Sequence, residues 1–326
     1  MSTILVTGGA GFIGSHTTEA LLDRGDDVVC LDNFDDYYSP QRKRANIAPL
    51  MGRPGYVLVE GDIRDQDALE ALFQAHRPAR IVHTAAMAGV RYSIQHPGLY
   101  ESVNVRGTLD VLEMARRYDV ENVVFASTSS IYGARQQVPF REDDRVDWPV
   151  SPYAATKRAC ELLAYTYHHL HGLNFTALRF FTVYGPRGRP DMAPYLFTEA
   201  VFRGTELKMF GDGSSSRDYT YIDDVVQGIV AAIDRSLGYE IINLGNSRTV
   251  LLRDFIALVE DLVGRKANVV QHPMPPGDVP RTCADISRAQ RLLGYDPQTS
   301  FEEGMARFVD WYRTVVVAPG QECAGR

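Results

Sequence analysis

The chain alternates short apolar segments rich in β-branched residues with longer segments of helical period, and this alternation limits the possible folds more than any other feature. The expected strands are Thr3–Thr7, Asp27–Leu31, Tyr56–Val59, Arg80–Thr84, Asn122–Ser127 and Phe175–Phe180. The expected helices between them are Ile13–Arg24, Asp67–Ala75, Leu99–Tyr118 and Ser151–His171. Apolar strands separated by helices form parallel sheets that are covered on both faces. Together with the right-handed crossover rule, the pattern predicts a doubly wound parallel α/β sheet.

The alternation changes after about Gly185, where Pro186, Pro190 and Pro194 crowd one loop. Further helices are expected at Ile222–Arg235, Leu252–Val263 and Phe301–Val317, with a strand at Tyr239–Leu244. We therefore expect a main domain over residues 1–185 and a smaller C-terminal α/β lobe over residues 186–326. The segment of about 222–245 is free to pack back on the main domain.

Charge and cysteine content narrow the class of protein. The 326 residues carry a formal net charge of -7, which argues against a nucleic-acid-binding surface. Four scattered cysteines, Cys30, Cys160, Cys283 and Cys323, have no spacing typical of a metal site or a disulfide framework. No apolar run approaches the ~18 residues needed to span a membrane, and no leader peptide is evident. We expect a cytoplasmic protein without a metal.

A glycine-rich turn follows the first expected strand. Gly8, Gly11 and Gly14 lie between that strand and a helix. The first glycine permits a tight turn, the second lets the backbone approach a pyrophosphate, and the third allows close helix packing. The phosphates would lie at the helix N-terminus, where unpaired N–H groups favour anions. The spacing is a variant of the dinucleotide fingerprint of Rossmann-type domains.

Two acids after the next strands strengthen this interpretation. Asp32 ends the second expected strand, where a carboxylate accepts hydrogen bonds from an adenosine ribose and repels a 2′-phosphate. Asp62 follows the third strand and is placed to meet the adenine. The sequence thus predicts a site for NAD rather than NADP.

A tyrosine and a lysine one helical turn apart are the catalytic candidates. Tyr153 and Lys157 share one face of an expected helix. A free tyrosine has a pKa of ~10 and is a poor base at neutral pH. A nearby ammonium and the positive nicotinamide ring both favour the phenolate, and two close cations can supply the ~4 kcal/mol that a three-unit reduction requires. Lys157 can also hold the nicotinamide ribose.

Hydroxyl groups end the fifth expected strand. Ser127, Thr128 and Ser129 stand at the carboxyl edge, where open α/β sheets bind ligands. Thr128 is the expected hydroxyl partner of Tyr153, with Ser127 and Ser129 beside it.

With these motifs in place, the chain resembles an extended short-chain dehydrogenase/reductase of the NAD-dependent nucleotide-sugar epimerase family over nearly its whole length. The matching segments are Gly8–Gly14, Ala126–Gly133, Tyr153–Lys157, Leu178–Pro186 and Ser216–Asp224. Family dehydratases carry an Asp-Glu pair after the threonine, whereas this chain has Ser129-Ser130. The resemblance therefore implies an isomerase rather than a dehydratase.

Within this family, the segments Ala86–Ser93, Arg179–Pro186 and Gly188–Met192 resemble UDP-glucuronate 4-epimerases. The resemblance implies interconversion of UDP-glucuronate and UDP-galacturonate through a transient 4-keto sugar, with Tyr153 as base and tightly bound NAD as hydride store. UDP-glucose or UDP-N-acetylglucosamine 4-epimerase and UDP-glucuronate decarboxylase are the alternatives. A non-catalytic NAD-binding sensor is a more remote one.

The resemblance also implies further contacts. Those to NAD are Phe12, Ile13, Asn33, Ile63, Ala85, Ala86, Asn104 and Phe180. Those to the UDP-sugar are Met87, Arg91, Ser93, Thr182, Arg189, Met192, Phe197, Phe210, Arg217, Asp278 and Arg281. Surface ion pairs remain an alternative for Arg217 and Arg281, and core packing for the two phenylalanines. A homodimer built from the helices around Leu99–Tyr118 and Ser151–His171 is implied as well.

Overall fold

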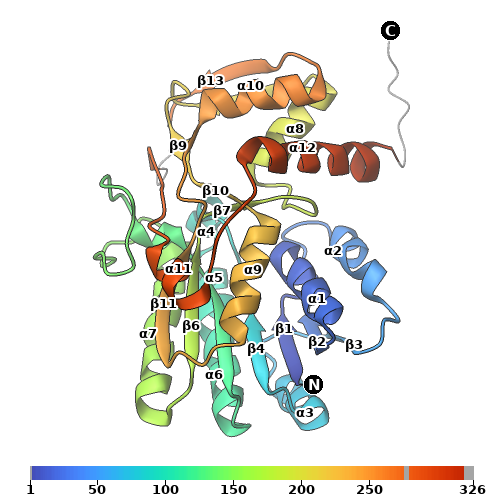
Figure 1. Cartoon of the computed structure of the whole chain (residues 1–326), viewed down its shortest axis with the longest axis vertical. Coiled ribbons are helices and arrows are strands. Elements are labelled where there is room, and N and C mark those ends of the chain that lie inside the picture. Colours follow the sequence, from blue (N-terminus) through green and yellow to red (C-terminus); the bar gives the residue numbers. More distant parts are fainter. Residues whose placement is uncertain (1, 275–278, 319–326) are drawn as a thin grey trace.

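The computed structural model describes residues 2–274 and 279–318 and contains the predicted doubly wound sheet (Figure 1). Seven strands lie in the order β11-β6-β5-β4-β1-β2-β3, and every neighbouring pair is parallel. The strands are β1 Thr3–Thr7, β2 Asp27–Asp32, β3 Tyr56–Glu60, β4 Arg80–His83, β5 Asn122–Thr128, β6 Phe175–Phe180 and β11 Tyr239–Leu244. The fold class predicted from the sequence is confirmed.

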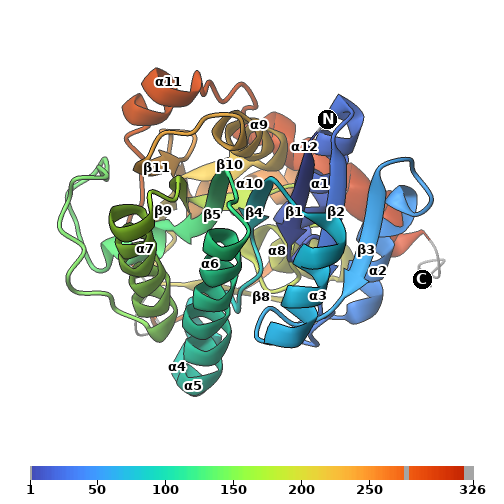
Figure 2. The same cartoon turned by 90° about the horizontal axis from the view of Figure 1, so that it is seen from below.

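Helices cover both faces of the sheet (Figure 2). On one face lie α3 Gln66–His76, α6 Gly107–Arg117 and α7 Pro152–His171; on the other lie α1 Phe12–Arg24, α9 Ile222–Ile233 and α11 Ser287–Leu293. Local sequence sets the ends of α7. Ser151 caps its first turn by accepting from the N–H of Ala154, Pro152 starts it, and Gly172 ends it in the left-handed conformation.

The predicted helix Leu99–Tyr118 is divided in the structure. A short helix, α5 Pro97–Tyr100, passes into a wider π-helical stretch over Glu101–Arg106 before α6 begins at Gly107. A Cβ at Gly107 would stand 2.5 Å from the Ile63 side chain, so the helix packs tightly there. The wider turn directs Asn104 inward, as such turns often do near functional sites.

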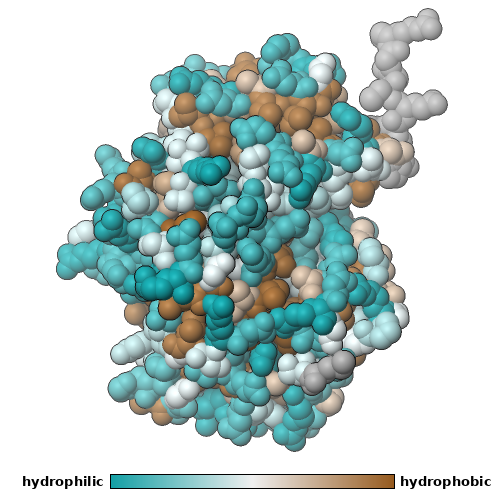
Figure 3. Space-filling view, in the orientation of Figure 1, coloured by the Kyte–Doolittle hydropathy of each residue, from teal (hydrophilic) through white to brown (hydrophobic). Residues whose placement is uncertain are grey.

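The smaller lobe lies above the carboxyl edge of the sheet (Figure 1). Its helices are α8 Ala193–Arg203, α10 Leu252–Val263 and α12 Phe301–Trp311, the last followed by a wider turn over Tyr312–Val317. Its strands form three short pairs: β7 Thr182–Tyr184 with β10 Tyr219–Tyr221, β8 Glu206–Phe210 with β13 Asn268–His272, and β9 Ser216–Arg217 with β12 Val250–Leu251. Apolar side chains gather on the visible face of this lobe over α8 and α10 (Figure 3).

The two units are interleaved in sequence. β11 lies beside β6 in the large sheet, and α9 packs against β4, β5 and β6. Asn122 at the start of β5 donates to the carbonyls of Ala232 and Ile233 at the end of α9. The segment between β7 and β11 therefore leaves the sheet for the smaller lobe and then returns to it. The division at residue 185 stays a prediction.

The remaining elements lie in the loops around the cleft. They are α2 Pro40–Ile47, α4 Val90–Gln95 and the 3-10 turns Ala48–Leu50 and Ser129–Tyr132. In the described parts of the chain, no helix has the length and apolar character needed to cross a bilayer.

Asp218 lies between β9 and β10 and binds two later segments of the chain, one after β11 and one before α11. Its carboxylate, 0% exposed, accepts from the backbone N–H groups of Asn246, Ser247 and Ala284 at 2.7, 3.0 and 2.9 Å. The hydroxyl of Thr220 is a fourth donor, at 3.3 Å.

We expect Asp218→Asn to lower the free energy of unfolding by about 1–3 kcal/mol, because its amide nitrogen would face buried donors that then lack an acceptor. Asp212→Asn is the control, since Asp212 is exposed and accepts hydrogen bonds from Ser214 in its own turn. Chemical denaturation at pH 7 measures both. Equal stability of the two variants would contradict the assigned role of Asp218.

Candidate active site

The candidate site is a cleft above the gap between β1 and β4, where the strand order reverses. Open α/β sheets bind ligands at this switch point. The cleft is open to solvent on one side, and its lining extends from Asp32 and Asp62 at one end to Tyr153 and Arg189 at the other.

The glycine turn forms the floor of the cleft by close backbone approach. Gly8 has a φ of +68°, and a Cβ there would stand 2.7 Å from the backbone nitrogen of Ala85. A Cβ at Gly14 would stand 2.1 Å from the carbonyl oxygen of Gly8. Helix α1 begins at Phe12 with no side-chain cap and no acid in its first turn. Its N–H groups therefore suit the phosphates of a dinucleotide.

The two predicted acids lie at the adenosine end of the cleft. Asp32 accepts from the N–H groups of Ala10 and Phe34 at 3.0 and 2.8 Å, and burial raises its pKa. Each carboxylate oxygen keeps a lone pair for a ribose hydroxyl. Hydrogen bonds from Arg64 and Asn33 lower the pKa of Asp62 to about 2. These residues fit the adenosine half of NAD.

Tyr153 lies in the first turn of α7 and hydrogen-bonds with Thr128 at the end of β5. Burial raises the pKa of Tyr153, whereas the Thr128 hydrogen bond and the charge of Arg189 act to lower it. Lys157 donates to the carbonyl of Ala126 at 2.8 Å, and burial lowers its pKa to about 8. The predicted Tyr-Thr pair thus forms, while the Lys157 ammonium is turned toward the strand.

Ser127 has a different environment from Thr128. Its hydroxyl donates to Glu161 at 2.7 Å, and Glu161 forms a 2.9 Å ion pair with Arg179. The side chains of Glu161 and Arg179 are 0% and 1% exposed. Arg158 binds the same carboxylate. Ser127 also lines the cleft, so it joins this buried network to the site, and its catalytic role stays a prediction.

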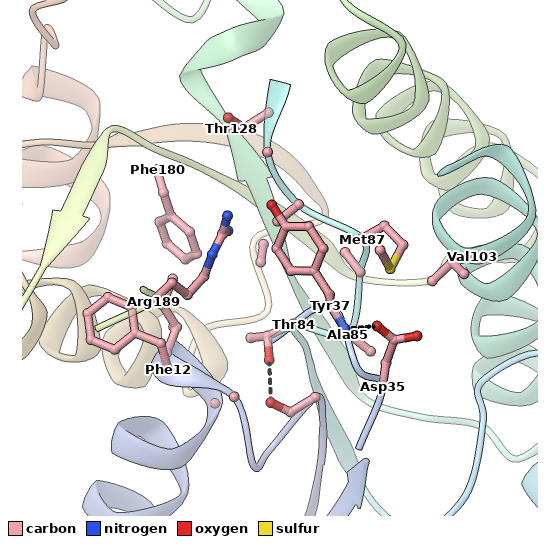
Figure 4. A pocket seen from close by; sticks show the side chains of 18 of the residues that line it. Phe12, Asp35, Tyr37, Thr84, Ala85, Met87, Val103, Thr128, Phe180 and Arg189 are labelled. Carbon is pink, nitrogen blue, oxygen red and sulfur yellow. Dashed lines mark hydrogen bonds between the residues drawn. The ribbon is translucent and has the colours of Figure 1, made fainter. Parts of the chain in front are cut away.

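Most other predicted site residues line the cleft (Figure 4). Those at its cofactor end are Gly8, Gly11, Phe12, Ile13, Gly14, Asp32, Asn33, Asp62, Ile63, Ala85 and Ala86. Those at its catalytic end are Met87, Thr128, Ser129, Tyr153, Lys157, Phe180, Thr182, Arg189 and Met192.

Three predicted contacts lie below the cleft surface. Ser93 is 0% exposed and donates to the carbonyl of Val90, and Phe197 packs in the core against Phe255. The Asn104 amide binds the backbone N–H and carbonyl of Met87 at 2.8 and 3.0 Å. Ser93 and Phe197 are thus packed inside the protein, and Asn104 holds a wall of the cleft. Direct ligand contact by these three residues stays a prediction.

The predicted uridine diphosphate contacts form two pairs beyond the cleft lining. The Arg91 guanidinium lies 4.5 Å from the centre of the Phe210 ring, which joins α4 to β8 of the smaller lobe. Arg217 and Arg281 lie on adjacent segments, because Arg281 bridges to Ser216. Asp278 lies outside the described residues.

The sequence analysis missed several lining residues in the segment after β2. Tyr37 and Tyr38 on the loop and Lys43 in α2 line the cleft, and Lys43 donates to the carbonyl of Asp35 at 2.7 Å. Their position was the available signal, because this segment leaves the carboxyl end of a parallel strand. Asp191, also missed, pairs with Arg189 at 2.5 Å.

Comparison with known proteins identifies relatives of the whole chain. Residues 5–308 match the model of the GDP-mannose 4,6 dehydratase family. UDP-glucuronate 4-epimerase 4 of Arabidopsis thaliana is 45% identical over 329 residues, covering 95% of this chain and 75% of the relative. The UDP-glucuronate 4-epimerase of Thermodesulfobacterium geofontis is 44% identical over 312 residues, covering 95% and 96%.

A solved structure agrees with these relatives. The UDP-glucuronic acid 4-epimerase of Bacillus cereus, crystallised with UDP-glucuronic acid and NAD, superposes with a TM-score of 0.91. It is 36% identical in sequence, and the match covers 96% of this chain and 99% of that one.

Gly8→Ala is expected to lower NAD affinity at least ~tenfold, because the new methyl group would press on Ala85 and displace the turn. Gly25→Ala is the matched control: Gly25 has a φ of +93° with nothing within 4 Å of a Cβ. It carries similar backbone strain away from the cleft. Calorimetric titration of NAD measures both, and equal affinities would contradict the proposed site.

Proposed function

The chain belongs to the extended short-chain dehydrogenase/reductase family described by the GDP-mannose 4,6 dehydratase model, and from this premise we propose that it is an NAD-dependent UDP-glucuronate 4-epimerase. It interconverts UDP-glucuronate and UDP-galacturonate. The observation that carries the proposal is the Tyr153–Thr128 pair in one cleft with Arg189. A base and a cation for an acidic sugar thus share the catalytic end of the cleft.

The residues at the other end fit NAD: the glycine turn would hold its phosphates, and Asp32 would hold its adenosine ribose. When bound, it supplies a store for the hydride that leaves C4 of the sugar and returns to the opposite face. Lys157 lines the catalytic end of the cleft and would hold the nicotinamide ribose if its ammonium exchanged the Ala126 carbonyl for that ligand.

Tyr153 takes the proton of the 4-hydroxyl as C4 is oxidised, and returns it when the ketone is reduced. Thr128 hydrogen-bonds with Tyr153, and this bond favours the phenolate. Burial of Tyr153 opposes ionisation, so positive charge nearby is required. Arg189 supplies part of that charge, and a protonated Lys157 released from Ala126 would add to it.

The C6 carboxylate creates a hazard specific to this substrate. The 4-keto sugar is a β-keto acid, which loses carbon dioxide when its C–CO₂ bond lies parallel to the carbonyl π orbital. Arg189 and Thr182, both in the cleft lining, offer charged and hydroxyl donors that hold the carboxylate away from that alignment. Decarboxylation to a UDP-pentose is the nearest alternative activity.

The matching family model is named for a dehydratase, but this chain lacks the acids that dehydration requires. Ser129 and Ser130 follow Thr128, where family dehydratases carry an Asp-Glu pair. Both serines line the cleft. They can donate hydrogen bonds to the sugar but do not serve as a general acid at neutral pH.

We also propose a homodimer formed through α6 and α7. Leu162 and Tyr165 on α7 are each 52% exposed, although α7 packs against α6 along its other side. A second copy would cover these apolar side chains. The cytoplasmic location stays a prediction.

Purified protein incubated with UDP-glucuronate, without added NAD, is expected to form UDP-galacturonate, observed by NMR. Formation of a UDP-pentose would instead indicate a decarboxylase. Turnover of UDP-glucose alone would reject the acidic substrate, and no turnover of any sugar despite bound NAD would indicate a sensor. Tyr153→Phe is expected to lower kcat at least ~100-fold while retaining NAD, because it removes the base.

Thr128→Ala is expected to lower kcat by about tenfold to a hundredfold, since it removes a hydrogen bond to the reacting phenolate. Ser127→Ala is the neighbouring control. It should lower the free energy of unfolding by ~1–2 kcal/mol with little change in kcat, because its hydroxyl serves Glu161. The reverse order of effects on kcat would contradict both assignments.

A further inference from the structure

Three segments far apart in the sequence meet at the catalytic end of the cleft. Arg189 and Asp191 lie on the loop between β7 and α8, Tyr37 on the loop after β2, and Gly89 before α4. Figure 4 shows the Arg189 side chain extending into the cleft between Phe180 and Tyr37. The proposed function uses Arg189 as the cation that meets the acidic sugar, so the contacts that hold its side chain bear directly on substrate binding.

The backbone around Arg189 is fastened to α1. A ring nitrogen of His16 lies 2.9 Å from the carbonyl oxygen of Pro186, and Arg187 pairs with Glu19 at 2.9 Å. Because the glycine turn lies at the N-terminus of α1, these contacts fix the position of the loop between β7 and α8 relative to the cofactor end of the cleft. These contacts place the backbone of Arg189 but do not orient its guanidinium.

Asp191 and Tyr37 orient the side chain. Arg189 donates from Nε to Oδ1 of Asp191 at 3.0 Å and from Nη2 to Oδ2 at 2.5 Å. The Tyr37 hydroxyl donates to Oδ2 at 3.0 Å, and its ring lies 5.6 Å from the guanidinium carbon. Among the described residues, Nη1 of Arg189 has no hydrogen-bond partner and remains for a ligand.

Gly89 packs directly against the group formed by Arg189, Asp191 and Tyr37. Its φ is +101°, and a Cβ there would stand 2.8 Å from the Tyr37 hydroxyl and 3.5 Å from Nη2 of Arg189. Its carbonyl accepts from Tyr100 at 3.0 Å, and the Tyr100 ring packs edge-to-face on Tyr153. The guanidinium is thus held beside the wall that supports the catalytic tyrosine.

We propose that Asp191 and Tyr37 are positioning residues for the epimerisation: the carboxylate and the hydroxyl together fix the guanidinium of Arg189 so that Nη1 meets the carboxylate of the acidic sugar. This inference rests on the proposed function. A bidentate pair restricts a guanidinium to one plane, which a single contact does not do. The pair is ready before the substrate arrives, so less conformational freedom is lost on binding.

Asp191 has a second, electrostatic effect on Tyr153. The negative charge of Asp191 raises the pKa of Tyr153, and the positive charge of Arg189 lowers it. Thr128 and Tyr100 also contact Tyr153, and Lys157 lines the same cleft. Tyr37 itself stays neutral in an assay, because burial raises its pKa to about 12. The roles of Asp191 and Tyr37 can therefore be separated experimentally.

The experiment compares two variants with two controls in the NAD-loaded protein. Tyr37→Phe removes the hydroxyl and keeps every charge, and its control is Tyr92→Phe, a neighbouring ring 5.1 Å from Tyr37. Asp191→Asn removes the charge, and its control is Asp36→Asn, an exposed acid on the Tyr37 loop. Each protein is assayed for KM, kcat and pH profile with UDP-glucuronate. The Kd values of UDP-glucuronate and of UDP are measured by calorimetry.

Tyr37→Phe is expected to raise the KM and Kd of UDP-glucuronate about threefold to tenfold, while kcat and the Kd of UDP stay unchanged. Asp191→Asn is expected to move the acidic limb of the pH profile to lower pH, because Tyr153 ionises more readily without the nearby negative charge. Tyr37→Phe should leave that limb in place. A variant that merely loosened the fold would weaken UDP as well.

Three results would overturn the proposal: equal behaviour of Tyr37→Phe and Tyr92→Phe, equal weakening of UDP and UDP-glucuronate, or the same pH shift in Asp36→Asn as in Asp191→Asn. Failure of the proposed function gives a different result. If the unmodified protein binds UDP-glucuronate without converting it, the Kd comparison still decides the role of Tyr37. If it does not bind UDP-glucuronate, both proposals fail.

Discussion

At the gap between β1 and β4, two stretches of backbone approach so closely that only hydrogen fits between them. The Cα of Gly8 faces Ala85, and the next turn of chain at Gly14 presses on the carbonyl of Gly8. This contact places the N-terminus of α1 over the carboxyl edge of the sheet. It also positions the segment of residues 85–87, whose Met87 backbone is hydrogen-bonded by the Asn104 side chain. Both segments line the cleft, so this contact sets the position of its floor.

A buried ion pair holds the end of β5, the strand that carries Ser127 and Thr128. Glu161 and Arg179 are both fully buried, and such a pair is tolerated only when its hydrogen bonds are satisfied. Ser127 and Arg158 complete the bonds to the carboxylate. The same helix carries Lys157 one turn earlier and Tyr153 two turns earlier. The ion pair therefore fastens α7 to β5 and β6 directly below the reacting groups.

Local patterns in the sequence predicted the sheet, the glycine turn and the Tyr153–Thr128 pair. Each of these depends on residues close in sequence or on the rule that parallel strands end at one edge. Ser93 and Phe197 were expected at the ligand, but burial is decided by packing from distant segments. The same reason hid Asp191 and Tyr37: the hydrogen bond between them joins residues 154 positions apart. The residue spacing within either loop does not predict that Tyr37 and Asp191 form a hydrogen bond.

Because β11 comes late in the sequence, the large sheet is incomplete during much of the chain's synthesis. Translation delivers β6 about sixty residues before its outer neighbour, and α9, which covers three of the strands, is also still missing. Before β11 and α9 are synthesised, β6 is an edge strand paired only with β5, and one face of the sheet lacks the apolar cover that α9 provides. A nascent chain halted near residue 185 thus holds all the glycines of the turn and the catalytic tyrosine, yet lacks the elements that complete the sheet beneath them. The large sheet is therefore complete only when the chain has reached Leu244 at the end of β11.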